Sequence, residues 1–140
     1  MDKTVNILLV EDDEIDVMGV RRAFRKLKIA NPLTVAHNGL EALRILRGED
    51  GHEAPKRPFM VLLDLNLPRM NGIEFLTELR RDPELHSTIV FVLTTSKDDE
   101  DRFAAYEFNV AGYMVKSKIG KDFMDLVSML DHYWRVIEFP

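Results

Sequence analysis

The sequence predicts an α/β fold in which a five-stranded parallel sheet carries helices on both faces. Short apolar runs alternate with segments whose apolar residues recur every three or four positions, and this alternation occurs five times. The runs are continuously apolar, which is typical of strands that are buried on both faces of a parallel sheet. A length of 140 residues suits a single domain, so we expect one such sheet.

The first strand is expected over residues 5–10, which end directly before three acidic residues. A helix follows from Glu14 to about Lys28, because apolar side chains recur along it at helical spacing. Asn31-Pro32 ends this helix, since proline disfavours the helical conformation in the residue before it. The second strand is expected over residues 33–36.

Asn38 and Glu41 have the spacing of a capping box and predict the start of the second helix. A polar loop rich in glycine and proline, residues 48–58, leads to the third strand at 59–63. The third helix is expected over 72–80, where three apolar residues share one face.

The fourth strand is expected over residues 89–93. Ser96 and Asp99 again have capping-box spacing, so we expect Ser96 to cap the fourth helix. A short fifth strand follows at 112–115. The last helix is expected from residue 119 to about 137, because seven apolar side chains form one stripe along it.

Composition excludes several classes of protein. The chain has no cysteine, which excludes disulfide scaffolds, thiolate metal sites and cysteine catalysis. A net charge of −5 argues against a nucleic-acid partner. No apolar run is long enough for a membrane span, and residues 1–10 lack the pattern of a signal peptide. We therefore expect a cytoplasmic protein.

Side chains suited to binding or catalysis follow four of the five strands. Glu11 and Asp12 come after the first strand, Asp64 after the third, Thr94 after the fourth and Lys116 after the fifth. Parallel sheets of this kind bind ligands at the carboxyl ends of their strands. These side chains are therefore expected to lie together at one edge of the sheet.

The set suits phosphoryl chemistry. Neighbouring carboxylates repel one another unless a cation binds among them, and oxygen-only ligands favour Mg²⁺, with Mn²⁺ as a substitute. Lys116 and Thr94 would stabilise the oxygens of a phosphoryl group. Asp64 is the best-placed nucleophile, because its central strand lies between the other acids and Thr94.

The sequence resembles the receiver domains of two-component response regulators. The resemblance covers residues 5 to about 132 in the family's order and spacing, and it implies a flavodoxin-like, doubly wound sheet with strand order 2-1-3-4-5. The motifs that carry it are Glu11-Asp12, LLDLNLP at 62–68, Met70-Asn71-Gly72, VLTT at 92–95 and GYMVK at 112–116.

The resemblance implies that Asp64 accepts a phosphoryl group from a sensor histidine kinase. Asp12 then resembles the direct metal ligand, Glu11 the ligand that acts through water, and Asn66 the residue whose backbone carbonyl completes the metal site. The position of Ser96, together with that of Asn66, tunes hydrolysis of the acyl phosphate in the family. No other enzymatic activity is implied.

Thr94 and Lys116 resemble the pair that contacts the phosphoryl oxygens, and Tyr113 resembles the aromatic switch residue. Most family members have a cis proline after the lysine, whereas this chain has Ser117. A cis bond before a residue other than proline costs about 2.5–4 kcal/mol. We therefore expect a trans Lys116–Ser117 bond, with the long lysine stem still reaching Asp64.

Residues 92–96, Lys116-Ser117 and the tail ending at Pro140 are similar to stand-alone regulators that partner phytochrome kinases. The resemblance implies a single receiver domain over 1–140, with 132–140 extending the last helix. Such a protein would signal through phosphorylation-dependent partner binding or dimerisation.

The tail offers large apolar side chains where polar residues are usual. We expect them to form a homodimer together with the last helix and strand, as in the phytochrome-partner regulators, and the alternative is that they fold back onto this chain's own core. The residues concerned are Tyr133, Trp134, Ile137 and Phe139.

Three other functions are compatible with a doubly wound sheet of this kind. A phosphohydrolase of the haloacid-dehalogenase type needs a second aspartate two residues after the nucleophile, where this chain has Asn66. A flavodoxin would bind phosphate in its first loop, which Glu11, Asp12 and Asp13 would repel. A pseudo-receiver that binds partners without phosphorylation stays open as the alternative.

Overall fold

The computed structural model describes residues 4–120 and 122–140 and contains one parallel sheet of order β2-β1-β3-β4-β5. This order confirms the fold class predicted from the sequence. The strands are β1 (Asn6–Val10), β2 (Leu33–Ala36), β3 (Phe59–Leu63), β4 (Ile89–Thr94) and β5 (Gly112–Val115).

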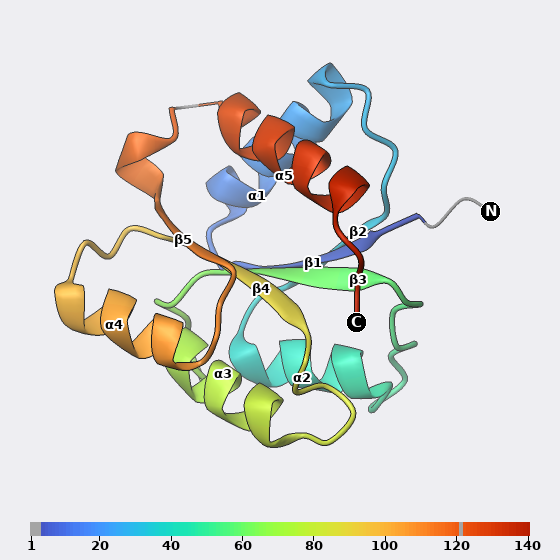
Figure 1. The fold of residues 1–140 in the computed structure, drawn as a ribbon, viewed down its shortest axis with the longest axis vertical. Helices are drawn as coiled ribbons and strands as arrows, with labels where there is room; N and C mark the ends of the chain where they lie inside the picture. The colour runs from blue at the N-terminus through green and yellow to red at the C-terminus, as the bar shows by residue number, and fades with distance from the viewer. Residues whose placement is uncertain (1–3, 121) are drawn as a thin grey trace.

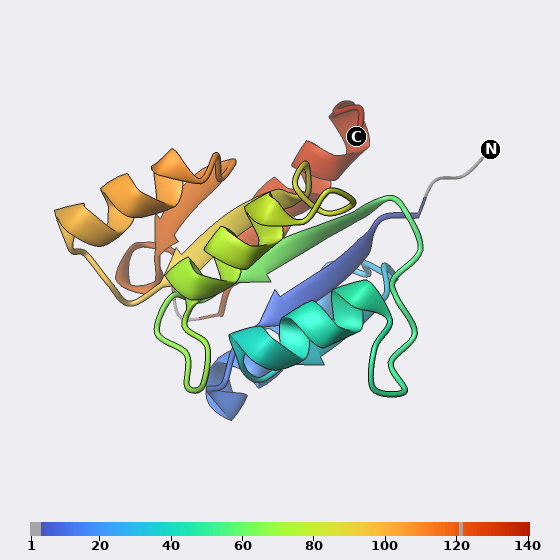
Figure 2. The same ribbon diagram turned by 90° about the horizontal axis from the view of Figure 1, so that it is seen from below.

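Five α-helices cover the two faces of the sheet. In Figure 1, α1 and α5 lie above the sheet, and α2, α3 and α4 lie below it. Figure 2 shows the same three-layer arrangement from the side of α2, α3 and α4. The helices are α1 (Glu14–Lys26), α2 (Gly39–Arg47), α3 (Gly72–Arg81), α4 (Asp99–Glu107) and α5 (Met124–Val136).

The core has two layers, one on each side of the sheet. All five residues of β3 are buried. Alternate side chains of a strand point to opposite faces, so Val61 and Leu63 enter the layer under α2 and α3, while Met60 and Leu62 enter the layer under α1 and α5. This explains why β3 is apolar at every position.

Two helix starts agree with their sequence signals. The Asn38 side chain accepts a hydrogen bond from the Glu41 backbone N–H at 2.8 Å, so Asn38 is the N-cap of α2 as predicted. Asp13 caps α1 by accepting from the Ile15 N–H at 2.9 Å. The first helix ends at Lys26, two residues earlier than expected.

The predicted cap of α4 is wrong. Asp98 is the N-cap, and its side chain accepts from the Glu100 N–H at 2.9 Å. Ser96 Oγ instead donates to Asp101 Oδ2 at 2.7 Å. Four acidic residues in a row, 98–101, offered more than one capping register, and the loop geometry selected the later one.

The predicted start of the last helix is also wrong. A 3-10 helix, η1 (Lys116–Lys118), follows β5, and α5 begins only at Met124. Phe123 has a left-handed backbone (φ 60°), and its ring packs against Gly19 of α1, where an added Cβ would lie 2.6 Å from Cε2. Packing against α1 therefore outweighs the helical pattern here. Lys121 of the predicted helix lies outside the described residues.

The C-terminal segment packs on its own chain. Trp134 is 8% exposed, and its ring centroid lies 6.3 Å from that of Phe24 on α1. Tyr133 meets Phe91 of β4 edge-on at 4.8 Å between centroids. Phe139 packs against the same core layer. The structure therefore shows the contacts expected if the tail folds back onto the core of its own chain.

Within residues 4–120 and 122–140, no helix has both the length and the apolar character that crossing a membrane requires. The signal-peptide expectation concerned residues 1–10, of which 1–3 lie outside the described part of the chain.

Candidate functional site

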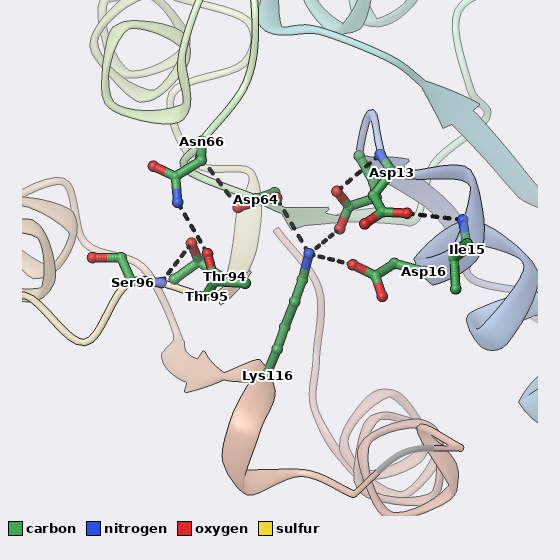
Figure 3. A network of polar contacts seen from close by, with 10 residues as sticks. Asp13, Ile15, Asp16, Asp64, Asn66, Thr94, Thr95, Ser96 and Lys116 are labelled. Atoms are coloured by element: carbon green, nitrogen blue, oxygen red, sulfur yellow. Dashed lines mark hydrogen bonds and ion pairs between the residues drawn. The ribbon is translucent and has the colours of Figure 1, made fainter.

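The carboxyl ends of the strands bring the predicted side chains to one edge of the sheet. Glu11 follows β1, Asp64 follows β3 and Thr94 ends β4, and their exposed fractions are 1%, 5% and 0%. Lys116 follows β5 and points toward Asp64 (Figure 3). Polar groups buried this deeply need partners, and the site supplies them to one another.

Three carboxylates form a cluster that suits a metal ion. Ligand oxygens of Glu11, Asp12 and Asp64 lie within 4.8 Å of one another. Asp12 is exposed and, with Asn66, lines an open cavity of about 460 Å³ beside the cluster. Hard divalent cations prefer such oxygen ligands and retain bound water, for which the open side leaves room. The donor set therefore fits Mg²⁺ or Mn²⁺.

Lys116 lies among the acids. Its Nζ donates to Glu11 Oε1 at 2.6 Å, to Asp16 Oδ2 at 2.7 Å and to Asp64 Oδ2 at 3.3 Å. An ammonium has three donors, so all three have acceptors here. Its Lys116–Ser117 bond is trans, as predicted, and the flexible stem reaches Asp64 from the end of β5.

Burial and neighbouring charges shift the pKa values of Glu11 and Lys116. Burial raises the pKa of Glu11 from 4.5 to about 8, the Lys116 hydrogen bond opposes this rise, and the charge of Asp64 adds to it. Burial alone would lower the pKa of Lys116, but hydrogen bonds to Asp16 and Glu11 and the charge of Asp64 raise it above its ordinary value. The ammonium is therefore firmly charged, and Glu11 is short of positive partners.

A second group of polar residues lies on the other side of Asp64 (Figure 3). The Asn66 N–H donates to Asp64 Oδ1 at 3.1 Å, and Asn66 Nδ2 donates to Thr95 Oγ1 at 3.2 Å. Thr94 Oγ1 accepts from the Ser96 N–H at 3.3 Å. Asp64 thus lies between a cationic side, formed by Lys116, and a hydroxyl-bearing side.

Tyr113 connects β5 to the loop before α4. Its OH donates to the Ser96 carbonyl at 3.1 Å, and burial raises the pKa of this phenol. The Ser96 hydroxyl in turn binds Asp101 in the first turn of α4. Ser96 is therefore hydrogen-bonded to Thr94, to Tyr113 and to the first turn of α4.

Sequence reasoning missed Asp16, Thr95 and Asp101. Asp16 lies in the first turn of α1, where acidic residues are common because they stabilise a helix N-terminus. Its position four residues after Asp12 was the available signal for an additional role. Thr95 and Asp101 have no comparable signal, because their partners depend on the path of one loop.

The structure does not bring the tail residues to this edge. Trp134, Ile137 and Phe139 line a cavity of about 1060 Å³ together with Val5 and Pro58, which precede β1 and β3. They therefore lie at the opposite, amino-terminal edge of the sheet.

Comparisons with known proteins agree with this geometry. The model of the response regulator receiver domain family matches residues 7–128. The chain is 38% identical over 128 residues to response regulator Rcp1 of Synechocystis sp., covering 91% of this chain and 87% of Rcp1.

Solved structures give the same result. The crystal structure of the phosphorylated cyanobacterial phytochrome response regulator RcpA is similar with a TM-score of 0.87 and 31% identity, covering 99% of both chains. The Mn²⁺-bound form of Rcp1 is similar with a TM-score of 0.81 and 35% identity, again over 99% of both chains. The chain therefore belongs to the response regulator receiver domain family.

Proposed function

We propose that this protein accepts a phosphoryl group from a sensor histidine kinase on Asp64 in a Mg²⁺-dependent reaction. One observation carries the proposal: Asp64 is 5% exposed and still has a cationic donor, Lys116, and two carboxylate neighbours suited to a metal. A structural aspartate would be satisfied by the lysine alone.

Each residue has a defined part in this reaction. An oxygen of Asp64 attacks the phosphorus of a phosphohistidine, the P–N bond breaks, and the imidazole nitrogen keeps the electron pair and takes up a proton. Lys116 and Thr94 donate to the phosphoryl oxygens, which carry the negative charge. The result is an acyl phosphate on Asp64.

When bound, the divalent cation supplies positive charge to the transferring group. Asp12, Asp64 and the backbone carbonyl of Asn66 would hold it, with Glu11 acting through water. The fit of the carboxylate oxygens supports this set, as does the relative Rcp1, for which a Mn²⁺-bound form is known.

Output would pass through Thr94 and Tyr113 to partner proteins. The hydrogen bonds that join Tyr113, Ser96 and Asp101 support this route. The relative RcpA is a phytochrome response regulator, so a phytochrome-like kinase is the proposed donor. Self-association through α5, β5 and the tail belongs to the same proposal, since Val136 of α5 is 80% exposed.

Incubation with acetyl phosphate and Mg²⁺ tests the proposal. We expect intact-mass spectrometry to show one added phosphate, which disappears in Asp64→Asn and when EDTA replaces Mg²⁺. Asp50→Asn is the matched control, because Asp50 is an exposed loop aspartate paired with Arg44, and it should be modified like the wild type. Persistent modification of Asp64→Asn would contradict the assignment. An unmodified wild type, with acetyl phosphate and with phosphorylated kinase, would instead favour the pseudo-receiver.

A further inference from the structure

Lys116 has one acceptor that does not belong to the metal-binding cluster. Of its three carboxylate partners, Glu11 and Asp64 are members of the cluster, whereas Asp16 comes from the first turn of α1. The contact with Asp16 Oδ2 is 2.7 Å, shorter than the 3.3 Å contact with Asp64 Oδ2. Figure 3 shows Asp16 approaching the ammonium from the side opposite Asp64.

This arrangement matters when a cation occupies the cluster. A divalent ion held by Asp12 and Asp64, with Glu11 acting through water, would withdraw negative charge from two of the three acceptors of Lys116. It also places a like charge close to the ammonium, which favours movement of the flexible lysine stem toward solvent. Asp16 keeps its full charge for Lys116, because it is outside the cluster.

We propose, resting on the proposed function, that Asp16 is a positioning residue that holds Lys116 Nζ beside Asp64 when the metal is bound. Asp16 touches Lys116 and acts through it, while Lys116 makes the contact with the phosphoryl oxygen. The ammonium then meets the incoming group already oriented, with two donors free for it.

A simple role in stabilising the helix terminus does not account for the contacts of Asp16. Asp13 already caps α1, and Glu14 in the same turn supplies negative charge to the helix N-terminus. The side chain of Glu14 is 67% exposed and pairs with His37 at 3.2 Å. The side chain of Asp16 is 21% exposed and is turned to Lys116.

The first test observes Lys116 directly in the full-length protein. In ¹⁵N-lysine-labelled protein, the side-chain NH₃⁺ resonance that disappears in Lys116→Met should be protected from exchange with water, both without metal and with saturating Mg²⁺. In Asp16→Asn the protection should be lost on adding Mg²⁺. Glu14→Gln, which removes one charge from the same helical turn, should retain it.

The second test measures the rate of phosphorylation by acetyl phosphate. We expect Asp16→Asn to slow it about tenfold, Glu14→Gln to change it less than twofold, and Mn²⁺ affinity from electron paramagnetic resonance to change less than threefold. In a Lys116→Ala background, Asp16→Asn should cause no further loss, because coupled residues are not additive. Asp16→Glu keeps the charge and should restore much of the rate. If Asp16→Asn does not fold, Asp16→Ala, which also removes the carboxylate, replaces it.

The outcomes separate the two proposals. If the wild type is phosphorylated and Asp16→Asn behaves like Glu14→Gln in both tests, Asp16 does not position Lys116, although the proposed function stands. An additive effect in the Lys116→Ala background would overturn the inference in the same way. If the wild type is not phosphorylated, the proposed function fails, and retained protection of the Lys116 resonance in Asp16→Asn would then overturn the inference separately.

Discussion

Individual residues in the site are defined by burial combined with charge. Glu11 and Asp64 are almost fully buried, and Lys116 is the cation that the described residues place within hydrogen-bonding distance of both. One ammonium shared among three carboxylates leaves a deficit of positive charge. This deficit contributes to the raised pKa of Glu11, and a bound divalent cation would neutralise the excess negative charge.

This deficit predicts an unusual dependence of stability on pH. The pKa of Glu11 is about 8 in the folded protein and 4.5 ordinarily, so between these values the folded state holds a proton that the unfolded state has lost. The free energy of unfolding should therefore fall as pH rises from 5 to 8 in EDTA, by at most about 1.4 kcal/mol per pH unit.

Urea unfolding at pH 5, 6.5 and 8 measures this slope. Glu11→Gln cannot titrate and should flatten it, whereas Glu53→Gln, at an exposed loop glutamate, should leave it unchanged. Equal slopes in the wild type and Glu11→Gln would show that Glu11 titrates normally.

At the scale of elements, α5 is held by its contacts with α1 and with the sheet. Trp134 packs near Phe24, Tyr133 meets Phe91, and the ring of Phe123 fills the space beside Gly19. These contacts fix where α5 begins and how its last turn lies. They also make the tail part of the core, which changes how it can be manipulated in experiments.

The packing predicts contrasting effects of two neighbouring substitutions on α5. Trp134→Ala removes a large buried side chain and should lower the free energy of unfolding by about 3–5 kcal/mol. Val136→Ala, at an 80% exposed position, should change it by less than about 0.5 kcal/mol. Denaturant unfolding monitored by circular dichroism compares them, and similar costs for both would contradict the fold-back of the tail.

At the scale of the whole molecule, the candidate site and the tail lie at opposite edges of the sheet. Signals between subunits would therefore travel through the helical faces rather than through the tail itself. Met129, at 37% exposure, and Val136, at 80%, are exposed apolar side chains of α5 and would form part of the proposed pairing surface. Deleting the residues after Asp131 would test the role of the tail in self-association, but it would also remove Trp134 from the core. A point substitution on the surface of α5 therefore tests self-association more directly.

We predict that the intact chain forms a dimer at micromolar concentrations and that Val136→Asp is monomeric. An aspartate at this position would place two like charges near a two-fold axis, where the same surface of each subunit meets. Sedimentation velocity with and without acetyl phosphate measures the assembly. Ile15→Asp, at a 79% exposed position on α1, is the control and should remain dimeric. Monomers throughout would refute self-association.

The positions of the strands and the convergence of the site could be predicted from sequence alone. The strands are predominantly apolar, and parallel strands place their carboxyl ends at one edge whatever the details of the loops. Glu11, Asp64 and Lys116 directly follow strand ends and Thr94 is the last residue of β4, so topology alone brings them together. A trans Lys116–Ser117 bond also followed from local energetics.

Other features depend on which elements touch, and only the tertiary structure decided them. The Asp16–Lys116 pair joins residues a hundred positions apart on α1 and after β5. The late start of α5 follows from Phe123 packing at Gly19, and no local pattern encodes that contact. From sequence, a second copy of the chain was the expected partner of the tail's apolar residues, and this chain's own core was the alternative. In the structure Trp134 packs against Phe24 in the core of its own chain. The hydrophobic effect is non-directional, so the sequence pattern does not specify which surface buries an apolar side chain, and the tertiary geometry does.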